Sequence, residues 1–239
     1  MRIIHVAPRY YPHIGGVEYV VKNIVERLTK MGHEVTVLAG EPSIDKSTEE
    51  EINGVHVLRW PTWSPNEAYH IPRKRDELKE WLRKNAKEVD VIHFHNVHAI
   101  LSIYSLNAIK DINTWKVFTP YYHGTGHTAF RKALWTIWRH TAKKALKQAD
   151  VIHTVSKLES ELVEKDFGIK AIVIENGVEE WIQEITWNPR NYVMYSGRIE
   201  KYKNIHRLGN IVKILNEEYG LDLELKVFGK GPYRKTLEK

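Results

Sequence analysis

The fold class follows from the stretch IIHVAPRYYPHIGGVEYVV, residues 3–21. Its β-branched beginning predicts a buried strand over 3–7, and the apolar spacing from Gly16 onward predicts a helix. Gly15 and Gly16 lie between the two, where ligands enter α/β sheets outside the carboxyl ends of the strands. Glycine lets backbone approach a ligand closely, and a helix N-terminus offers free N–H groups to an anion. The loop is therefore either a bare turn or part of a ligand-binding cleft.

The spacing of these glycines argues against a nicotinamide cofactor. Dinucleotide-binding loops carry G-x-G-x-x-G immediately after a strand, with the first glycine making a tight turn. Here the third glycine is missing, and the loop from Pro8 to Gly15 is too long for that turn. A cleft for another phosphorylated ligand is the better interpretation.

Strand and helix patterns alternate along the rest of the chain. Alternation of this kind predicts parallel strands joined by right-handed crossovers, and hence an α/β fold with a Rossmann-like, doubly wound parallel sheet. The expected strands are 3–7, 34–39, 55–60, 89–94, 116–122, 150–156, 171–176, 192–197 and 223–229, and the expected helices are about 16–32, 73–88, 98–110, 128–148, 157–167 and 203–219.

A domain boundary is expected within 181–191. The strand before it ends in Asn-Gly, an irregular polar stretch with a proline follows, and a new strand–helix–strand pattern begins at Tyr192. We therefore expect one Rossmann-like domain over 1–188 and the beginning of a second over 189–239. Two strands are marginal for an independent core, so the chain is expected to stop within its second domain.

Composition narrows the class of protein. The 239 residues include no cysteine, which excludes disulfides, thiol nucleophiles and thiolate metal sites. With abundant Lys and Glu, this is typical of a cytoplasmic, thermophile-like protein. No signal peptide precedes the first strand, and no apolar run approaches the ~18 residues that span a bilayer. The net charge of +6 permits nucleic acid, anionic lipid or a phosphorylated substrate as partner.

Histidines follow two of the expected strands. In HFHNVH, His93 and His95 share a strand face and His98 follows, which allows a metal site. Because the nearest carboxylate is Asp90 at the strand start, polar lining of a cleft or simple packing is the favoured interpretation. In YYHGTGHT, residues 121–128, His123 is either a ligand-binding or proton-transferring residue or a solvated loop histidine.

Two expected helices are strongly basic. The helix at 128–148 contains no acid, and Arg139, Lys143 and Lys147 recur at i, i+4 spacing beside an apolar stripe that predicts core packing. The second, which opens with RKR at 73–75, also carries Trp81. Such basic faces are either merely solvated or attract anionic lipid or phosphate. No nucleic-acid-reading module is recognisable, so peripheral contact with an anionic membrane is favoured over nucleic acid.

The stretch SGRIEKYKN, residues 196–204, offers two cations at the start of a helix. A strand ends in Gly197, Arg198 follows, and Lys203 comes five residues later. Arg binds phosphate bidentately and Lys adds a point charge, so the pair suits a diphosphate. The alternative is an ordinary capped turn with surface charges.

Taken together, these motifs resemble the family 4 glycosyltransferases, retaining enzymes of GT-B architecture. The resemblance runs the length of the chain and depends on the order of eight short motifs. They are PHIGGVE, GHEVTVL, DVIHFH, HG at 123–124, ADVIHTVS, ENGV at 175–178, SGRIEKYKN and VFGKGP at 228–232.

The resemblance implies a nucleotide-sugar donor in the C-terminal domain and a glycosyl or lipid-linked acceptor in the N-terminal one. His123 resembles the cleft histidine near the transferred sugar, and Arg198 and Lys203 the pair that neutralises the diphosphate leaving group. These three are the expected catalytic residues. The residues expected to contact donor or acceptor are Gly15, Gly16, Glu18, His95, Ser156, Asn176, Gly197, Gly229 and Gly231.

The implied reaction needs no metal cofactor, because fixed cations stabilise the charge that develops on the diphosphate. The family's E-x7-E segment would follow GKGP, and this chain ends first. The chain alone is therefore expected to show little or no transfer activity, unless a second chain completes it. A non-catalytic binding or scaffold protein and a sugar-nucleotide epimerase of the same architecture are the alternatives.

Overall fold

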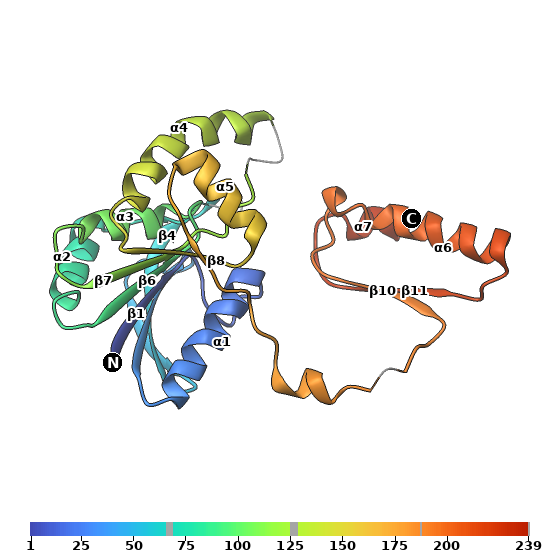
Figure 1. The fold of residues 1–239 in the computed structure, drawn as a ribbon, viewed down its shortest axis with the longest axis horizontal. Coiled ribbons are helices and arrows are strands. Elements are labelled where there is room, and N and C mark those ends of the chain that lie inside the picture. Colours follow the sequence, from blue (N-terminus) through green and yellow to red (C-terminus); the bar gives the residue numbers. More distant parts are fainter. Residues whose placement is uncertain (66–68, 125–128, 187, 239) are drawn as a thin grey trace. The chain divides into compact units, whose positions relative to one another are not determined.

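The computed structural model describes residues 1–65, 69–124, 129–186 and 188–238, with side chains in the helix at 129–146 described from residue 135. Its contacts divide the chain into two compact units, Met1–Gly177 and Val178–Lys239. The sequence prediction placed the boundary after residue 188, whereas the polar stretch before it groups with the second unit. Figure 1 shows unit 1 as a sheet wrapped by helices and unit 2 as a smaller strand–helix–strand segment.

Among the described residues of unit 1, nine strands form one sheet in the order β3-β4-β2-β1-β6-β7-β8-β9, with β5 paired to β4. The neighbours from β4 to β9 run parallel, as crossover helices require. The strands are β1 (Arg2–Ala7), β2 (Glu34–Glu41), β3 (Thr48–Ile52), β4 (Val55–Trp63), β5 (Ile71–Pro72), β6 (Val91–His95), β7 (Trp115–Thr119), β8 (Val151–Thr154) and β9 (Ile172–Val173).

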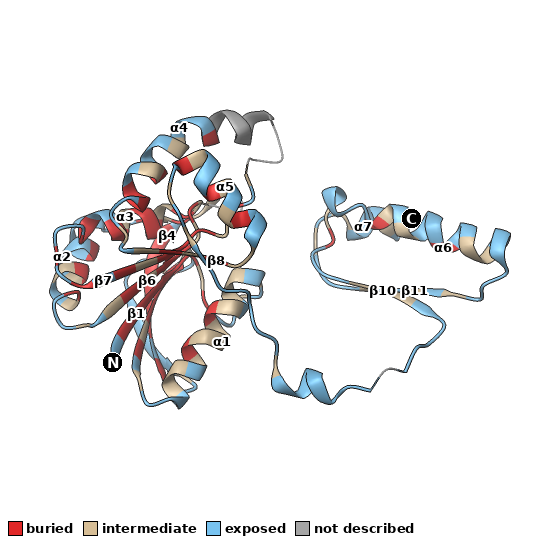
Figure 2. Cartoon of the chain, viewed as in Figure 1, coloured by how far each residue is buried: buried red, intermediate tan, exposed pale blue. Residues whose placement is uncertain are grey.

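Helices cover both faces of this sheet. On one face, α1 (Gly16–Lys30) buries Val21 and Val25 against β1, β2 and β4. On the other, a larger core contains side chains from the remaining four helices, and Figure 2 shows buried residues concentrated there. Each fully buried Val or Leu contributes about 1.5–3 kcal/mol. Those four helices are α2 (Arg75–Asn85), α3 (Ile100–Ala108), α4 (Ala129–Leu146) and α5 (Lys157–Phe167).

The sheet is therefore the doubly wound, largely parallel sheet that the sequence predicts, with one correction at its edge. β3 and β5 were missed, and both pair antiparallel with β4. β3 reads TEEEI, and glutamate has a low strand propensity. It forms a strand here because Glu50 meets the buried guanidinium of Arg59 on β4, with Nε donating to Oε1 at 2.6 Å. That pairing is tertiary and leaves no periodic signal in the sequence.

Unit 2 has a thin core. Its strands β10 (Tyr192–Ser196) and β11 (Glu224–Phe228) are parallel and joined by α6 (Ile205–Tyr219), which packs against β11. The buried apolar side chains among its described residues are Ile199, Ile205 and Val212, while large apolar groups such as Met194 and Phe228 are exposed. The short helices are η2 (Glu180–Glu184), η3 (Lys201–Lys203) and α7 (Arg234–Leu237).

Candidate functional site

The loop between β1 and α1 is anchored by two side chains from neighbouring strands. Glu41, at the end of β2, accepts a hydrogen bond from Nε2 of His13 at 2.7 Å. Arg59, 5% exposed, donates from Nη1 to the carbonyl of Tyr10 at 3.3 Å and from Nη2 to the carbonyl of Tyr11. The long loop is therefore held in place by contacts made before Gly15 is reached.

Glu41 is stabilised as a carboxylate by this anchoring. Burial raises its pKa, but hydrogen bonds from the His13 ring and from the Ser43 side chain and backbone outweigh burial and lower the pKa to about 2. A charged Glu41 is thus the form that holds the loop.

The two glycines of this loop stand in different surroundings. A Cβ on Gly15 would meet the carboxylate of Glu18, in the first turn of α1, at 2.2 Å. A Cβ on Gly16 would meet nothing within 4 Å, and Gly16 is exposed with no positive φ. Gly15 is the N-cap of α1 and makes no side-chain cap, so the first N–H groups of the helix lack that partner. Among the described atoms, nothing in the protein itself requires glycine at 16.

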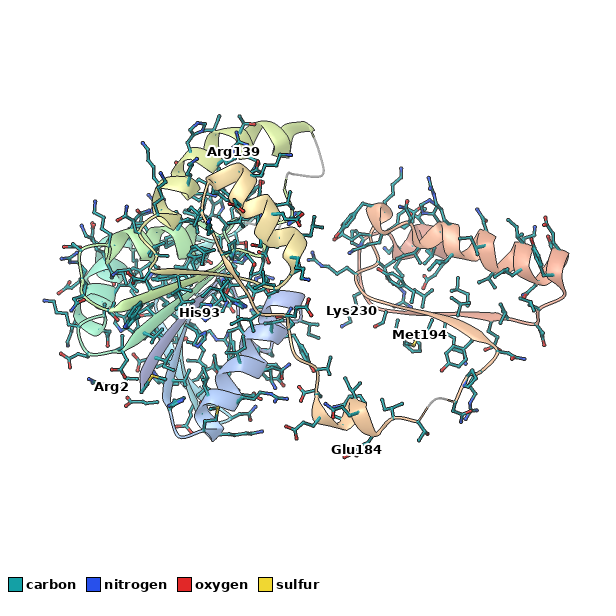
Figure 3. All side chains as sticks on the ribbon, viewed as in Figure 1. Arg2, His93, Arg139, Glu184, Met194 and Lys230 are labelled. Atoms are coloured by element: carbon teal, nitrogen blue, oxygen red, sulfur yellow. The ribbon has the colours of Figure 1, made fainter. Side chains whose placement is uncertain are left out.

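His95 and His93 of β6 belong to a cluster that the sequence prediction assigned incompletely. His5 of β1 lies in register with His93, and its Nδ1 is 3.0 Å from Nε2 of His95. Figure 3 labels His93 in the sheet of unit 1. Burial lowers the pKa of all three histidines, that of His5 to about 3, so the rings are neutral. His98, which was grouped with His93 and His95, instead packs its ring against Trp135 with 4.5 Å between centroids.

His123 follows β7 next to a pocket of unit 1. Its ring centroid lies 5.2 Å from that of His98. The pocket, of about 350 Å³, lies between the segment after β7 and helices α4 and α5. It is lined by Tyr122, Gly124, Trp135, Thr136, Arg139, Leu162, Lys165 and Asp166. Gly126 and His127, which belong to the same YYHGTGHT stretch, lie outside the described residues.

Ser156 and Glu159 hold the segments that follow β7 and β8, and sequence reasoning missed Glu159. Ser156 is the N-cap of α5, and its Oγ accepts from the backbone N–H of Glu159 at 3.1 Å. The buried Glu159 carboxylate accepts from the backbone N–H groups of Tyr122 at 2.7 Å and Val155 at 2.9 Å. Glu159 thereby positions the residue before His123. The signal was present as the S-x-x-E spacing of a capping box.

Asn176 lies in the irregular segment after β9, at the end of unit 1. Asn176 and Gly177 are both exposed, and a Cβ on Gly177 would meet nothing within 4 Å. The structure therefore leaves both residues accessible without assigning them a contact.

In unit 2, Arg198 and Lys203 lie on the connection between β10 and α6. Both are exposed, and Nη1 of Arg198 is 3.8 Å from Oε1 of Glu200. Lys203 lies over the Tyr202 ring, with Nζ 5.3 Å from its centroid. The side chain of Asn204, the N-cap of α6, accepts no hydrogen bond from the first turn of the helix. The first N–H groups of α6 therefore lack a capping side chain, as those of α1 do. Two cations and a helix N-terminus are therefore within one short connection.

The glycines of unit 2 pack backbone against backbone. A Cβ on Gly229 would lie 1.9 Å from the carbonyl oxygen of Gly197, and one on Gly231 would lie 2.1 Å from that of Ile199. Gly197 and Gly229 also have positive φ angles of 153° and 150°. The loops after β10 and β11 are hydrogen-bonded to each other, with Ile199 N–H donating to the carbonyl of Lys230 at 2.9 Å. These glycines are required by the fold of unit 2 itself.

A pocket of unit 2 lies away from these loops. It has a volume of about 650 Å³ and includes Tyr192 and Glu224, the first residues of β10 and β11. Arg198 and the glycine loops are at the carboxyl ends of the same strands. Because ligands of α/β sheets bind at the carboxyl ends, the size of this pocket does not make it the candidate site.

Comparison with known proteins identifies the family of this chain. The profile described as Glycosyltransferase Family 4 matches residues 14–180. The chain belongs to this family. The matched residues include Gly15, Gly16, the β6 histidines, His123 and Ser156. Nearly all of the matched region of this family 4 glycosyltransferase therefore lies in unit 1.

Two curated relatives are similar in sequence. The alpha-monoglucosyldiacylglycerol synthase of Acholeplasma laidlawii is 31% identical over 154 residues, covering 61% of this chain and 36% of that protein. The GDP-mannose:cellobiosyl-diphosphopolyprenol alpha-mannosyltransferase of Xanthomonas campestris is 24% identical over 209 residues, covering 83% of this chain and 52% of that protein. The matched region spans about a third to a half of the length of these relatives.

Solved structures show the same fold. TarM from S. aureus, solved with Fondaparinux, alpha-GlcNAc-glycerol and UDP, matches with a TM-score of 0.68 at 8% identity, covering 100% of this chain and 74% of that one. The neighbours are GT-B glycosyltransferases, which agrees with the predicted fold class. Among the described residues, no helix is both long and apolar enough to cross a membrane.

Proposed function

We propose that this family 4 glycosyltransferase takes a sugar from a nucleoside-diphosphate sugar and transfers it to a glycosyl or lipid-linked acceptor with retention of anomeric configuration. The observation that supports the donor most is the connection between β10 and α6, where exposed Arg198 and Lys203 flank a helix N-terminus that lacks a side-chain cap. Cations and helix N–H groups are the ligands that phosphate prefers in proteins.

In the proposed reaction, the bond between the sugar's anomeric carbon and the diphosphate oxygen breaks, and its electron pair stays on the diphosphate. The acceptor hydroxyl oxygen bonds to the anomeric carbon on the same face, and its proton passes to the leaving phosphate. Arg198 and Lys203 stabilise the charge that develops on the diphosphate, so the transfer requires no metal cofactor. His123 is proposed to bind the transferred sugar, and the open surroundings of Gly16 leave room for donor or acceptor to approach the backbone.

Titration calorimetry with UDP, GDP and ADP tests the donor site. We expect one of them to bind, and expect Arg198→Ala and Lys203→Ala each to weaken that binding by about 1.5–3 kcal/mol, or about tenfold to a hundredfold. Lys213→Ala removes an equal charge from an exposed position on α6 and is expected to bind as the wild type does. If no nucleoside diphosphate binds the folded protein, the non-catalytic alternative is favoured. If binding persists in both variants, Arg198 and Lys203 are not the diphosphate ligands.

We also propose that the acceptor is reached at an anionic membrane surface, which the protein contacts peripherally through α4. The exposed residues of this helix include Ile137, which is 75% exposed, His140 and Lys144, and the exposed Lys147 follows its last residue. An apolar residue surrounded by basic ones suits an interfacial helix. The named lipid product of the Acholeplasma relative agrees with such an acceptor.

Co-sedimentation with anionic liposomes tests this contact. We expect binding that falls as salt is raised, because the basic face is screened over about 8–10 Å at physiological salt. We expect weaker binding for the double variant Lys144→Ala, Lys147→Ala. Equal binding to neutral liposomes, or binding that salt leaves unchanged, would contradict an electrostatic contact.

A further inference from the structure

Three histidines meet on the α1 face of the sheet in unit 1. His93 and His95 are two residues apart on β6, and His5 is in register with His93 on β1, so all three side chains leave the same face. One ring nitrogen from each lies within 4.8 Å of the others. His5 and His95 are buried, whereas His93 is partly exposed.

The hydrogen bonds around the cluster assign the tautomer of His93. The carbonyl of Ile174 can only accept, so Nε2 of His153 donates to it at 2.9 Å. With Nδ1 of His153 accepting from the Thr119 hydroxyl at 2.8 Å, the Thr119 oxygen is left to accept from Nε2 of His93 at 2.7 Å. His93 therefore keeps a lone pair on Nδ1. A histidine that donates from one ring nitrogen and offers the other is the arrangement found in metal sites.

Of the other two histidines, His95 has a neighbour at both ring nitrogens, whereas His5 lacks a partner at one. Nδ1 of His95 is 3.4 Å from the Tyr121 hydroxyl, and its Nε2 shares one proton with Nδ1 of His5. Nε2 of His5 is buried and has no hydrogen-bond partner among the described residues. Buried ring nitrogens are normally satisfied, so a cluster that leaves one unpartnered points to a ligand that is able to use it.

We propose that His5, His93 and His95 bind one divalent transition-metal ion, for which Zn²⁺ is the best match. Three neutral imidazoles without a nearby carboxylate form a donor set that zinc accepts, with a fourth position for water. Zinc–nitrogen bonds of about 2.0–2.1 Å in a tetrahedral site require the nitrogens to be about 3.4 Å apart. The three nitrogens already lie within 4.8 Å of one another. The site lies wholly within unit 1, whereas Arg198 and Lys203 belong to unit 2, so metal binding and donor binding are measured separately.

The test uses the untagged chain after removal of metal by a chelator. Titration with ZnCl₂ is expected to show one site, with a rise in melting temperature that EDTA reverses, since a ligand of the native state stabilises it. His93→Ala changes the ligand that is partly exposed and is expected to weaken zinc binding more than about tenfold. His140→Ala, an exposed histidine on α4, is the matched control and is expected to bind as the wild type does.

A second measurement on the wild type keeps the proposal testable if His93→Ala does not fold. With CoCl₂, three imidazoles and one water are expected to give the intense visible absorption of a tetrahedral ion. The weak spectrum of an octahedral ion would mean surface binding and would overturn the proposal. So would the absence of stoichiometric zinc binding, or zinc binding that survives in folded His93→Ala.

Discussion

Gly16 of unit 1 and Gly229 of unit 2 look alike in the sequence, since each follows a strand in a glycine-containing loop. In the structure their surroundings are opposite. A Cβ on Gly229 would collide with the backbone oxygen of Gly197 at 1.9 Å, whereas a Cβ on Gly16 would meet nothing within 4 Å. One glycine is required by the packing of the protein, and the other is not. A glycine that the fold does not need, beside a helix N-terminus without a side-chain cap, is the better candidate for contact with a ligand.

The largest effect is expected when a side chain is added at Gly229. Gly229→Ala forces the loops after β10 and β11 apart and places alanine at a φ of 150°. Because unit 2 has a thin core, we expect a loss of about 3 kcal/mol or more, enough to unfold it. Hydrogen exchange measures this directly at the amides of Gly197 and Ile199, which donate to the carbonyls of Phe228 and Lys230.

The matched control for this change is Gly209→Ala in the middle of α6. A Cβ there meets nothing within 4 Å, so alanine is expected to stabilise the helix by about 0.5–1 kcal/mol. Equal protection of the Gly197 and Ile199 amides in Gly229→Ala and wild type would show that the backbone packing is not as tight as described.

An intermediate effect on stability is expected when Glu41, which anchors the glycine loop of unit 1, loses its charge. Glu41 has a folded-state pKa of about 2, below its ordinary value, so its contribution to stability is complete above pH of about 4.5 and is lost as the pH falls towards 2. Glu41→Gln removes the charge and is expected to lower the free energy of unfolding by about 1–2 kcal/mol at pH 7. The difference between wild type and variant should shrink between pH 4.5 and pH 2 in denaturant titrations. A difference that stays constant over that range would contradict this role of the carboxylate.

The parallel direction of most strands could be predicted from the sequence, because strand and helix patterns alternate along the chain. β3 could not, since its pairing depends on Arg59, a residue of another strand. The place of His5 beside His93 and His95 was missed for a similar reason. His5 lies inside an apolar strand and reads as core, and only the register between β1 and β6 brings it next to His93. Sequence spacing instead suggested His98, which the turn after β6 carries to the aromatic side chains near Trp135.

The candidate site, too, could be predicted only in part. The motifs located the glycine loop, Ser156 and the two cations, because motif order reports which strand ends they follow. The motifs did not separate a residue that holds the fold from one that is open to a ligand. Ser156 caps α5, and Gly229 and Gly231 allow two loops to pack, whereas Gly16, Arg198 and Lys203 are exposed. That distinction needs the distance to the next backbone atom, which the sequence does not contain.

The smallest effect on stability, and the most direct test of this account, is expected from Gly16→Ala. The free energy of unfolding and the binding of GDP-mannose and UDP-glucose would be measured for wild type, Gly16→Ala and Gly209→Ala. We predict that Gly16→Ala unfolds within about 0.5 kcal/mol of wild type while the nucleotide sugar that the wild type binds is held about tenfold or more weakly, and that Gly209→Ala binds it normally. If Gly16→Ala binds the nucleotide sugar as the wild type does, Gly16 is not part of the donor site. If Gly16→Ala is destabilised as strongly as Gly229→Ala, Gly16 is required by the fold.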